Sequence, residues 1–155
     1  IASCLVGSEM CIRDSPDAEK LYEVVRDRED LTRRLDHFLT ESEKIIPEAS
    51  KALSCGDLEE FGRMAQESQR AAEDLLGNQV PQTAVLARIA HDLGAVGSTS
   101  FGAGFGGSVW ALVPSAEAKE FAEKWITSYR DEYPEEASQA TTVVTRPGPS
   151  ARRLD

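Results

Sequence analysis

The segment GAGFGGS, residues 102–108, constrains the fold of this chain more than any other part of its sequence. Four of its first six residues are glycine, and each glycine costs conformational entropy when a loop becomes ordered. The flanking stretches, residues 95–101 and 108–113, are short and contain many strand-forming residues. We therefore expect a β-hairpin with an exposed turn backbone. A turn that requires positive φ angles is the purely structural explanation of the glycines.

An anion site is the second explanation, because backbone N–H groups without neighbouring side chains can converge on phosphate oxygens. Gly102, Gly104 and Gly107 also have the G-x-G-x-x-G spacing of dinucleotide-binding loops. That motif requires a helix after the glycines, whereas a strand-like segment follows them here. A Walker loop would end in Gly-Lys-Ser/Thr, but Ser108 follows Gly107 directly. The segment therefore matches neither of these two nucleotide-binding motifs.

Periodic apolar residues predict helical regions around the hairpin. These regions are residues 21–46 (one long helix or two in series), 57–77, 81–94 and 115–133. Pro47 should end or kink the first region, and Asp57 with Glu60 has the spacing of a capping box at the start of the second. In the third region, Val85, Leu86, Ile89 and Leu93 should form the buried face. A last strand is expected at residues 140–145, so the fold class is α+β, with helices packed on a small, mostly antiparallel sheet.

Composition excludes several classes of function. The chain has 155 residues, which fits one domain, and a formal charge of −10 from 17 basic and 27 acidic residues. This balance argues against nucleic acids and anionic membranes as partners, because their phosphates would be repelled. Three cysteines are too few for a disulfide scaffold, so we expect a cytoplasmic protein.

The ends of the chain differ from its middle. Residues 3–15 show no sustained helical or strand period and resemble a translated sequencing-adapter artefact, so we expect residues 1–15 to be non-native. Residues 16–146 are the expected folded domain. Residues 147–155 combine proline, glycine and arginine and are typical of an exposed tail.

The two histidines do not indicate catalysis. His37 lies on an apolar helix, where a position at the edge of the core is the simpler interpretation. His91 stands near a helix C-terminus, where a cation interacts well with the helix dipole. No serine is paired with either histidine by a recognisable motif, and no ligand set has the spacing of a zinc site. We therefore predict no catalytic residue and no metal ligand in this chain.

The run GAVGSTSFGAGFGGSVWALV, residues 94–113, resembles the third signature of the GHMP kinases, a family of sugar and small-metabolite kinases. Three further segments are similar to the C-terminal domain of its galactokinase branch, in the same order along the chain. They are HFLTESEKI (37–45), GDLEEFGRMAQES (56–68) and VVTRPGPSARRL (143–154). The similarity covers nearly everything from about Asp30 onward.

This resemblance implies a ferredoxin-like C-terminal domain of a kinase that transfers the ATP γ-phosphoryl group to a sugar hydroxyl with Mg²⁺. In the galactokinase branch, the acceptor is the anomeric hydroxyl of galactose. The glycine-rich loop of the family packs beside the nucleotide phosphates, where catalysis depends mostly on positioning and charge stabilisation. By resemblance, the nucleotide-binding residues would be Gly102, Ala103, Gly104, Phe105, Gly106, Gly107 and Ser108.

Some parts of the family pattern are changed or missing. Gln69 stands where galactokinases usually carry histidine, and Thr99 to Phe101 replace an Arg-Met-Thr run. The family's sugar-recognition motif, serine-rich phosphate loop and catalytic aspartate have no counterpart here. The resemblance thus implies a C-terminal fragment that is inactive alone, with the N-terminal half of the same kinase, a sugar and ATP as partners.

Three alternatives remain open from the sequence. One is a GHMP kinase that acts on another sugar or a sugar acid. Another is a catalytically silent, galactokinase-like sensor that keeps ligand binding without turnover. The third is a plain α+β interaction domain whose glycine-rich turn is only structural.

Overall fold

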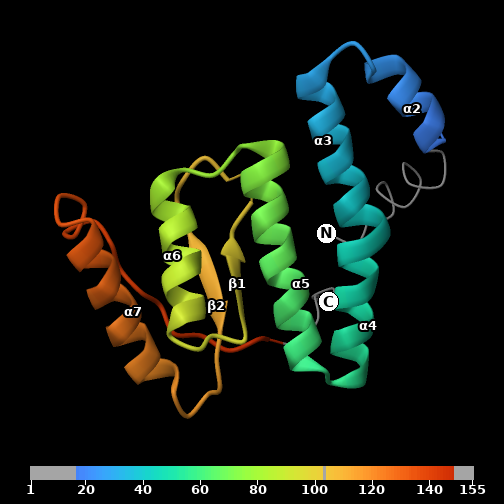
Figure 1. Ribbon diagram of the computed structural model, residues 1–155. Coiled ribbons are helices and arrows are strands. Elements are labelled where there is room, and N and C mark those ends of the chain that lie inside the picture. Colours follow the sequence, from blue (N-terminus) through green and yellow to red (C-terminus); the bar gives the residue numbers. More distant parts are fainter. Residues whose placement is uncertain (1–16, 103, 149–155) are drawn as a thin grey trace, which may run out of the picture.

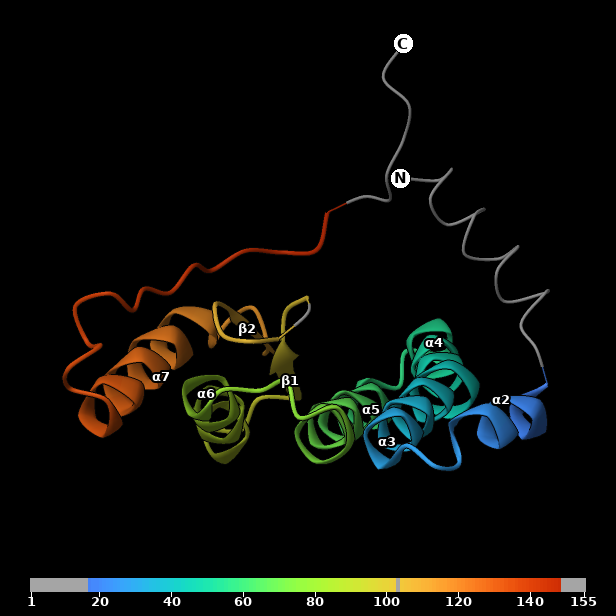
Figure 2. The same cartoon turned by 90° about the horizontal axis from the view of Figure 1, so that it is seen from above.

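The computed structural model describes residues 17–102 and 104–148, and its elements form one row of helices with a small hairpin on one face (Figure 1). The elements are helices α2 (Ala18–Val25), α3 (Glu29–Leu39), α4 (Ile46–Cys55), α5 (Leu58–Ala71), α6 (Pro81–Asp92) and α7 (Ala118–Glu132), π-helical segments η1 (Thr40–Ile45) and η2 (Ala72–Leu76), and strands β1 (Gly97–Ser100) and β2 (Val109–Leu112). Figure 2 shows the two strands over one side of the row, above α5 and α6. The predicted α+β class and small antiparallel sheet are confirmed. No helix in the described ranges is long and apolar enough to cross a membrane.

The two strands form the predicted hairpin. They pair antiparallel, with Gly97 opposite Leu112 at one end and Ser100 opposite Val109 at the other. Beyond that pair, the Phe101 N–H donates to the carbonyl oxygen of Ser108 at 2.9 Å. The hairpin therefore carries the glycine-rich loop at its tip.

Helix α5 packs directly against the backbone of β1 because both elements have a glycine at the contact. A Cβ atom at Gly62 would overlap the carbonyl oxygen of Val96. A Cβ atom at Gly97 would lie 2.9 Å from the Cα atom of Gly62. Next to this contact Met64 is completely buried, and the Phe61 ring stacks on Trp110 at a centroid distance of 6.2 Å. This close packing fixes the position of β1 relative to α5.

The buried face of α6 differs from the one that the apolar pattern predicts. Of the four residues expected inside, only Ile89 is buried, and the others are partly exposed. The small residues Thr83, Ala87 and Ala90 are buried instead, since α6 approaches β1 closely and short side chains permit that approach. The larger side chains of α6 lie outside its contact with β1. Helix α6 also contacts α7, where the Trp125 indole N–H donates to the carbonyl oxygen of Leu86 at 2.9 Å.

The N-terminal helical region consists of two helices, with a break at residues 26–28. Pro47 does not end the second one. Helix α3 continues through η1 into α4, where Pro47 lies in the first turn. Proline has no N–H and crowds the preceding turn, and the wider π-helical segment directly before it provides room for its ring. Helix α4 ends at Gly56, which has a left-handed backbone with a φ of 74°.

The strand expected at residues 140–145 is absent from the described structure. The segment is irregular, and Val143 is 86% exposed. Its β-branched residues favour an extended backbone, but a strand also needs a neighbour that supplies hydrogen bonds. Among the described residues no strand pairs with this segment, which runs past the helices as an extended connection (Figure 2).

Candidate functional site: the glycine-rich loop

The loop at the tip of the hairpin lies where α5 and η2 end and α6 begins (Figure 1). Its glycines adopt left-handed backbone angles, with φ of 64° at Gly102, 77° at Gly104 and 104° at both Gly106 and Gly107. L-residues with a side chain rarely adopt such angles, so the loop conformation requires these glycines. Ala103, which belongs to the predicted site, lies outside the described residues.

Phe105 also has a left-handed backbone, with a φ of 58°. This conformation is costly for a residue with a large side chain, so the surrounding structure must hold it. Its N–H donates to the carbonyl oxygen of Asn78 at 2.5 Å, while its side chain is 76% exposed. The backbone of the loop is thus attached to the segment between η2 and α6.

Gly104 has a packing role at the same contact. A Cβ atom there would lie 2.5 Å from the side-chain nitrogen of Asn78 and 2.7 Å from its carbonyl oxygen. Gly106 lies less tightly against Val80, whose Cγ2 atom would be 3.6 Å from an added Cβ. Gly104 is therefore required for packing as well as for its backbone angle, since only glycine allows the loop to reach Asn78.

Gly106 and Gly107 present groups that the fold itself does not use. Within the described part of the chain, no acceptor takes a hydrogen bond from the N–H of either residue. Gly107 and Ser108 are exposed, and no atom lies within 4 Å of where a Cβ of Gly107 would be. The loop has no charged side chain. It can therefore donate neutral hydrogen bonds to an anion, but it cannot neutralise the anion's charge.

Sequence reasoning missed two residues that hold the loop. Asn78 directly follows the second predicted helical region, and Gln69 stands out in the sequence only as a departure from the family pattern. Both are 6% exposed, and both contact the hairpin. The signal for Gln69 is its place four residues after Ala65, which puts a polar side chain on the buried face of α5. A buried polar residue needs hydrogen-bond partners, and here they are at the start of the loop.

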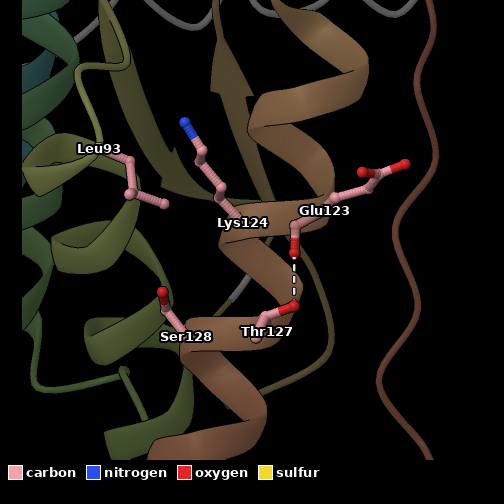
Figure 3. A pocket seen from close by; sticks show the side chains of 5 residues that line it. All are labelled: Leu93, Glu123, Lys124, Thr127 and Ser128. Carbon is pink, nitrogen blue, oxygen red and sulfur yellow. Dashed lines mark hydrogen bonds between the residues drawn. The ribbon is translucent and has the colours of Figure 1, made fainter.

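A shallow hollow lies between the C-terminal end of α6 and helix α7, away from the loop (Figure 3). It has a volume of about 320 Å³ and is lined by Leu93, Glu123, Lys124, Thr127 and Ser128. Lys124 is paired with Glu120 at 2.6 Å, and this contact lowers the pKa of Glu120 and raises that of Lys124. The Thr127 hydroxyl donates to the backbone of its own helix. These polar groups are already used within α7, so the hollow offers little to a ligand.

A second hollow, of about 540 Å³, lies between the start of α5 and the end of α6. It includes the Gln66 amide nitrogen, which lies 2.7 Å from the His91 Nδ1 atom. Arg63 forms two hydrogen bonds with Glu60 there, which lower the pKa of that carboxyl group. Neither hollow includes a residue of the loop. Among the described residues, no group of three or more histidine, cysteine, aspartate or glutamate side chains is placed to hold a metal ion.

The chain is similar in sequence and in structure to bacterial galactokinases. A galactokinase of Enterococcus faecalis is 37% identical over 102 residues, which cover 65% of this chain and 26% of that protein. A galactokinase of Clostridium perfringens is 32% identical over 132 residues, which cover 84% of this chain and 34% of that protein. The crystal structure of Lactococcus lactis galactokinase complexed with galactose is similar at a TM-score of 0.66 and 26% identity, covering 76% of this chain and 31% of that one.

The chain thus spans about a quarter to a third of the length of the curated relatives it matches. The family described as GHMP kinases C terminal matches residues 45–131, which are more than half of the chain. The chain therefore belongs to the C-terminal domain family of the GHMP kinases.

Proposed function

We propose that this chain is the C-terminal part of an ATP-dependent sugar kinase similar to galactokinase. In this proposal, residues 16–146 are the folded domain, and the N-terminal half of the same kinase, a sugar and ATP are its partners. The sugar is galactose, phosphorylated at its anomeric hydroxyl, since the relatives at 37% and 32% identity are galactokinases. We place the enzyme in the cytoplasm, where ATP is available.

The observation that carries the proposal is the pair of N–H groups at Gly106, which is partly exposed, and Gly107, which is exposed. Neither has an acceptor in the described part of the chain. Phosphate oxygens are strong acceptors, and backbone N–H groups in a glycine-rich turn suit them. The left-handed backbone of the loop holds these groups at the surface. Residues 102–108 would therefore line the nucleotide phosphates, with Gly104 and Phe105 attaching the loop to Asn78.

Mg²⁺ would offset the charge of the transferring phosphoryl group, which the uncharged loop cannot do. The carboxylates of the described residues form no cluster suited to this ion. In this proposal the nucleotide phosphates and groups of the N-terminal half hold the ion. The role of this chain is to position the phosphates with its backbone N–H groups.

Substitution of Gly107 in the full-length kinase tests this role. An alanine there meets no atom within 4 Å but must adopt a φ of 104°, so the loop shifts or the methyl group occupies the phosphate side. We expect Gly107→Ala to raise the KM for ATP about tenfold, which corresponds to about 1.4 kcal/mol of lost binding. Steady-state kinetics with ATP and galactose measure this change.

Gly94 provides the matched control. It also has a large positive φ, 88°, with no atom within 4 Å of an added Cβ, but it lies at the other end of α6. Gly94→Ala should lower the melting temperature by about as much as Gly107→Ala does, because both alanines must adopt a positive φ. It should leave the KM for ATP unchanged. Equal KM values for the two variants would remove the loop from nucleotide binding and favour a purely structural turn. Tight ATP binding without turnover in the parent protein would instead identify a silent sensor.

A further inference from the structure

Gln69 makes three hydrogen bonds that connect α5 with the start of the loop. Its Oε1 atom accepts from the Thr99 hydroxyl and from the Ser100 N–H, both at 2.9 Å. Its Nε2 atom donates to the Glu73 carboxylate at 2.7 Å. Only one orientation of the amide satisfies all of these partners, since a carboxylate only accepts and a backbone N–H only donates. Glu73 therefore keeps the Gln69 oxygen directed at β1.

The Ser100 N–H is the last one of β1 on the side away from β2. The next N–H, that of Phe101, donates to Ser108 and closes the hairpin. Because successive N–H groups of a strand point to opposite edges, the Ser100 N–H faces α5 and not β2. The Gln69 oxygen thus takes the place that a third strand would occupy, at the residue where the strand ends and the loop begins.

The distance between Gln69 and β1 is set by the glycine contact two turns earlier in α5. Gly62 and Gly97 bring the helix and strand backbones together, so the 6%-exposed Gln69 side chain reaches Ser100 without displacement of either element. Asn78 holds the far side of the loop through Phe105. The loop is therefore attached at its start by Gln69 and at its middle by Asn78.

We propose that Gln69 is a positioning residue, which directs the N–H groups of the glycine-rich loop through its hydrogen bonds to Thr99 and Ser100. This inference rests on the proposed role of the loop in binding the nucleotide phosphates. Gln69 touches neither the nucleotide nor the sugar in this arrangement. Its loss should free the start of the loop and so weaken nucleotide binding, with no effect on the binding of the sugar.

The test compares Gln69→Leu with Gln66→Leu in the full-length kinase. Gln66 lies on the same helix, one turn earlier, and contacts His91 at the C-terminal end of α6, away from the glycine-rich loop. For Gln69→Leu we expect amide hydrogen exchange of the Phe101 and Phe105 N–H groups, which are hydrogen-bonded in the parent protein, to be about tenfold faster. The KM for ATP should be about tenfold higher, with the KM for the sugar unchanged. Gln66→Leu should change none of these values, and the melting curve shows that each variant is folded at the assay temperature.

Gln69→His serves as the conservative variant. At pH 8 a neutral imidazole has one donor and one acceptor lone pair, so it can keep the bond to Glu73 and one of the two bonds to β1. It should therefore restore part of the slow exchange and part of the low KM for ATP. Exchange in Gln69→Leu no faster than in Gln66→Leu would overturn the inference, as would failure of the histidine to restore protection. Faster exchange with an unchanged KM for ATP would support the positioning role and disprove the proposed role of the loop in nucleotide binding.

Discussion

Glycines serve two different purposes in this protein. Gly62 and Gly104 allow close approach, since a Cβ atom at either position would overlap a neighbouring residue. Gly107 has open space where a Cβ would be, and its backbone angle is what requires glycine. A substitution at the first kind acts on packing, whereas one at the second kind acts on loop conformation. Only the second kind is informative about what the loop binds.

Gly62→Ala sets two opposite effects against each other. Alanine is favoured over glycine in a helix interior by about 1 kcal/mol. The added methyl group would, however, overlap the Val96 carbonyl oxygen, which belongs to the backbone and cannot move aside cheaply. Overpacking at a contact this close should cost about 3 kcal/mol. Because the helix propensity of alanine offsets about 1 kcal/mol of this, we expect a net loss in the free energy of unfolding of about 2 kcal/mol. Urea unfolding measures it, with the exposed Arg70→Ala on the same helix as a control near zero. Equal or greater stability of Gly62→Ala would contradict the close contact between α5 and β1.

Helix α5 is the element on which the site depends, because it supplies both the contact with β1 and Gln69. Its first turn is capped by Asp57, whose Oδ1 atom accepts from the Glu60 N–H at 3.0 Å. We expect Asp57→Ala to lower the free energy of unfolding by about 1 kcal/mol, and Asp57→Ser to restore most of it. Urea unfolding at pH 7 distinguishes the two. Equal losses in both variants would indicate that the cap hydrogen bond does not contribute.

The elements that sequence could predict are those defined by local signals. The hairpin, the Asp57 cap and the end of the second helical region at Gly77 follow from residues within a few positions of each other. The prediction of a strand at residues 140–145 was wrong, because strand pairing depends on a neighbour elsewhere in the chain. The same limit applies to the site. Its glycines were predicted, but the contacts that hold them, through Gln69 and Asn78, arise only when α5 and the hairpin pack together.

In the whole molecule an uncharged loop lies over the middle of the row of helices, where α5 and η2 end and α6 begins (Figure 1). Phe101 before the loop is 59% exposed, and Phe105 within it is 76% exposed. Phosphoryl transfer requires positive charge around the phosphates, and residues 102–108 provide none. We therefore expect residues 17–148 alone to show no phosphorylation of galactose by ATP. Addition of the separately expressed N-terminal half should restore turnover, since it would supply the missing charges and cover the exposed rings. A coupled assay for ADP release measures both cases. Turnover by residues 17–148 alone would contradict the proposal that the N-terminal half supplies the catalytic groups. The result does not depend on the role of any single residue in the loop.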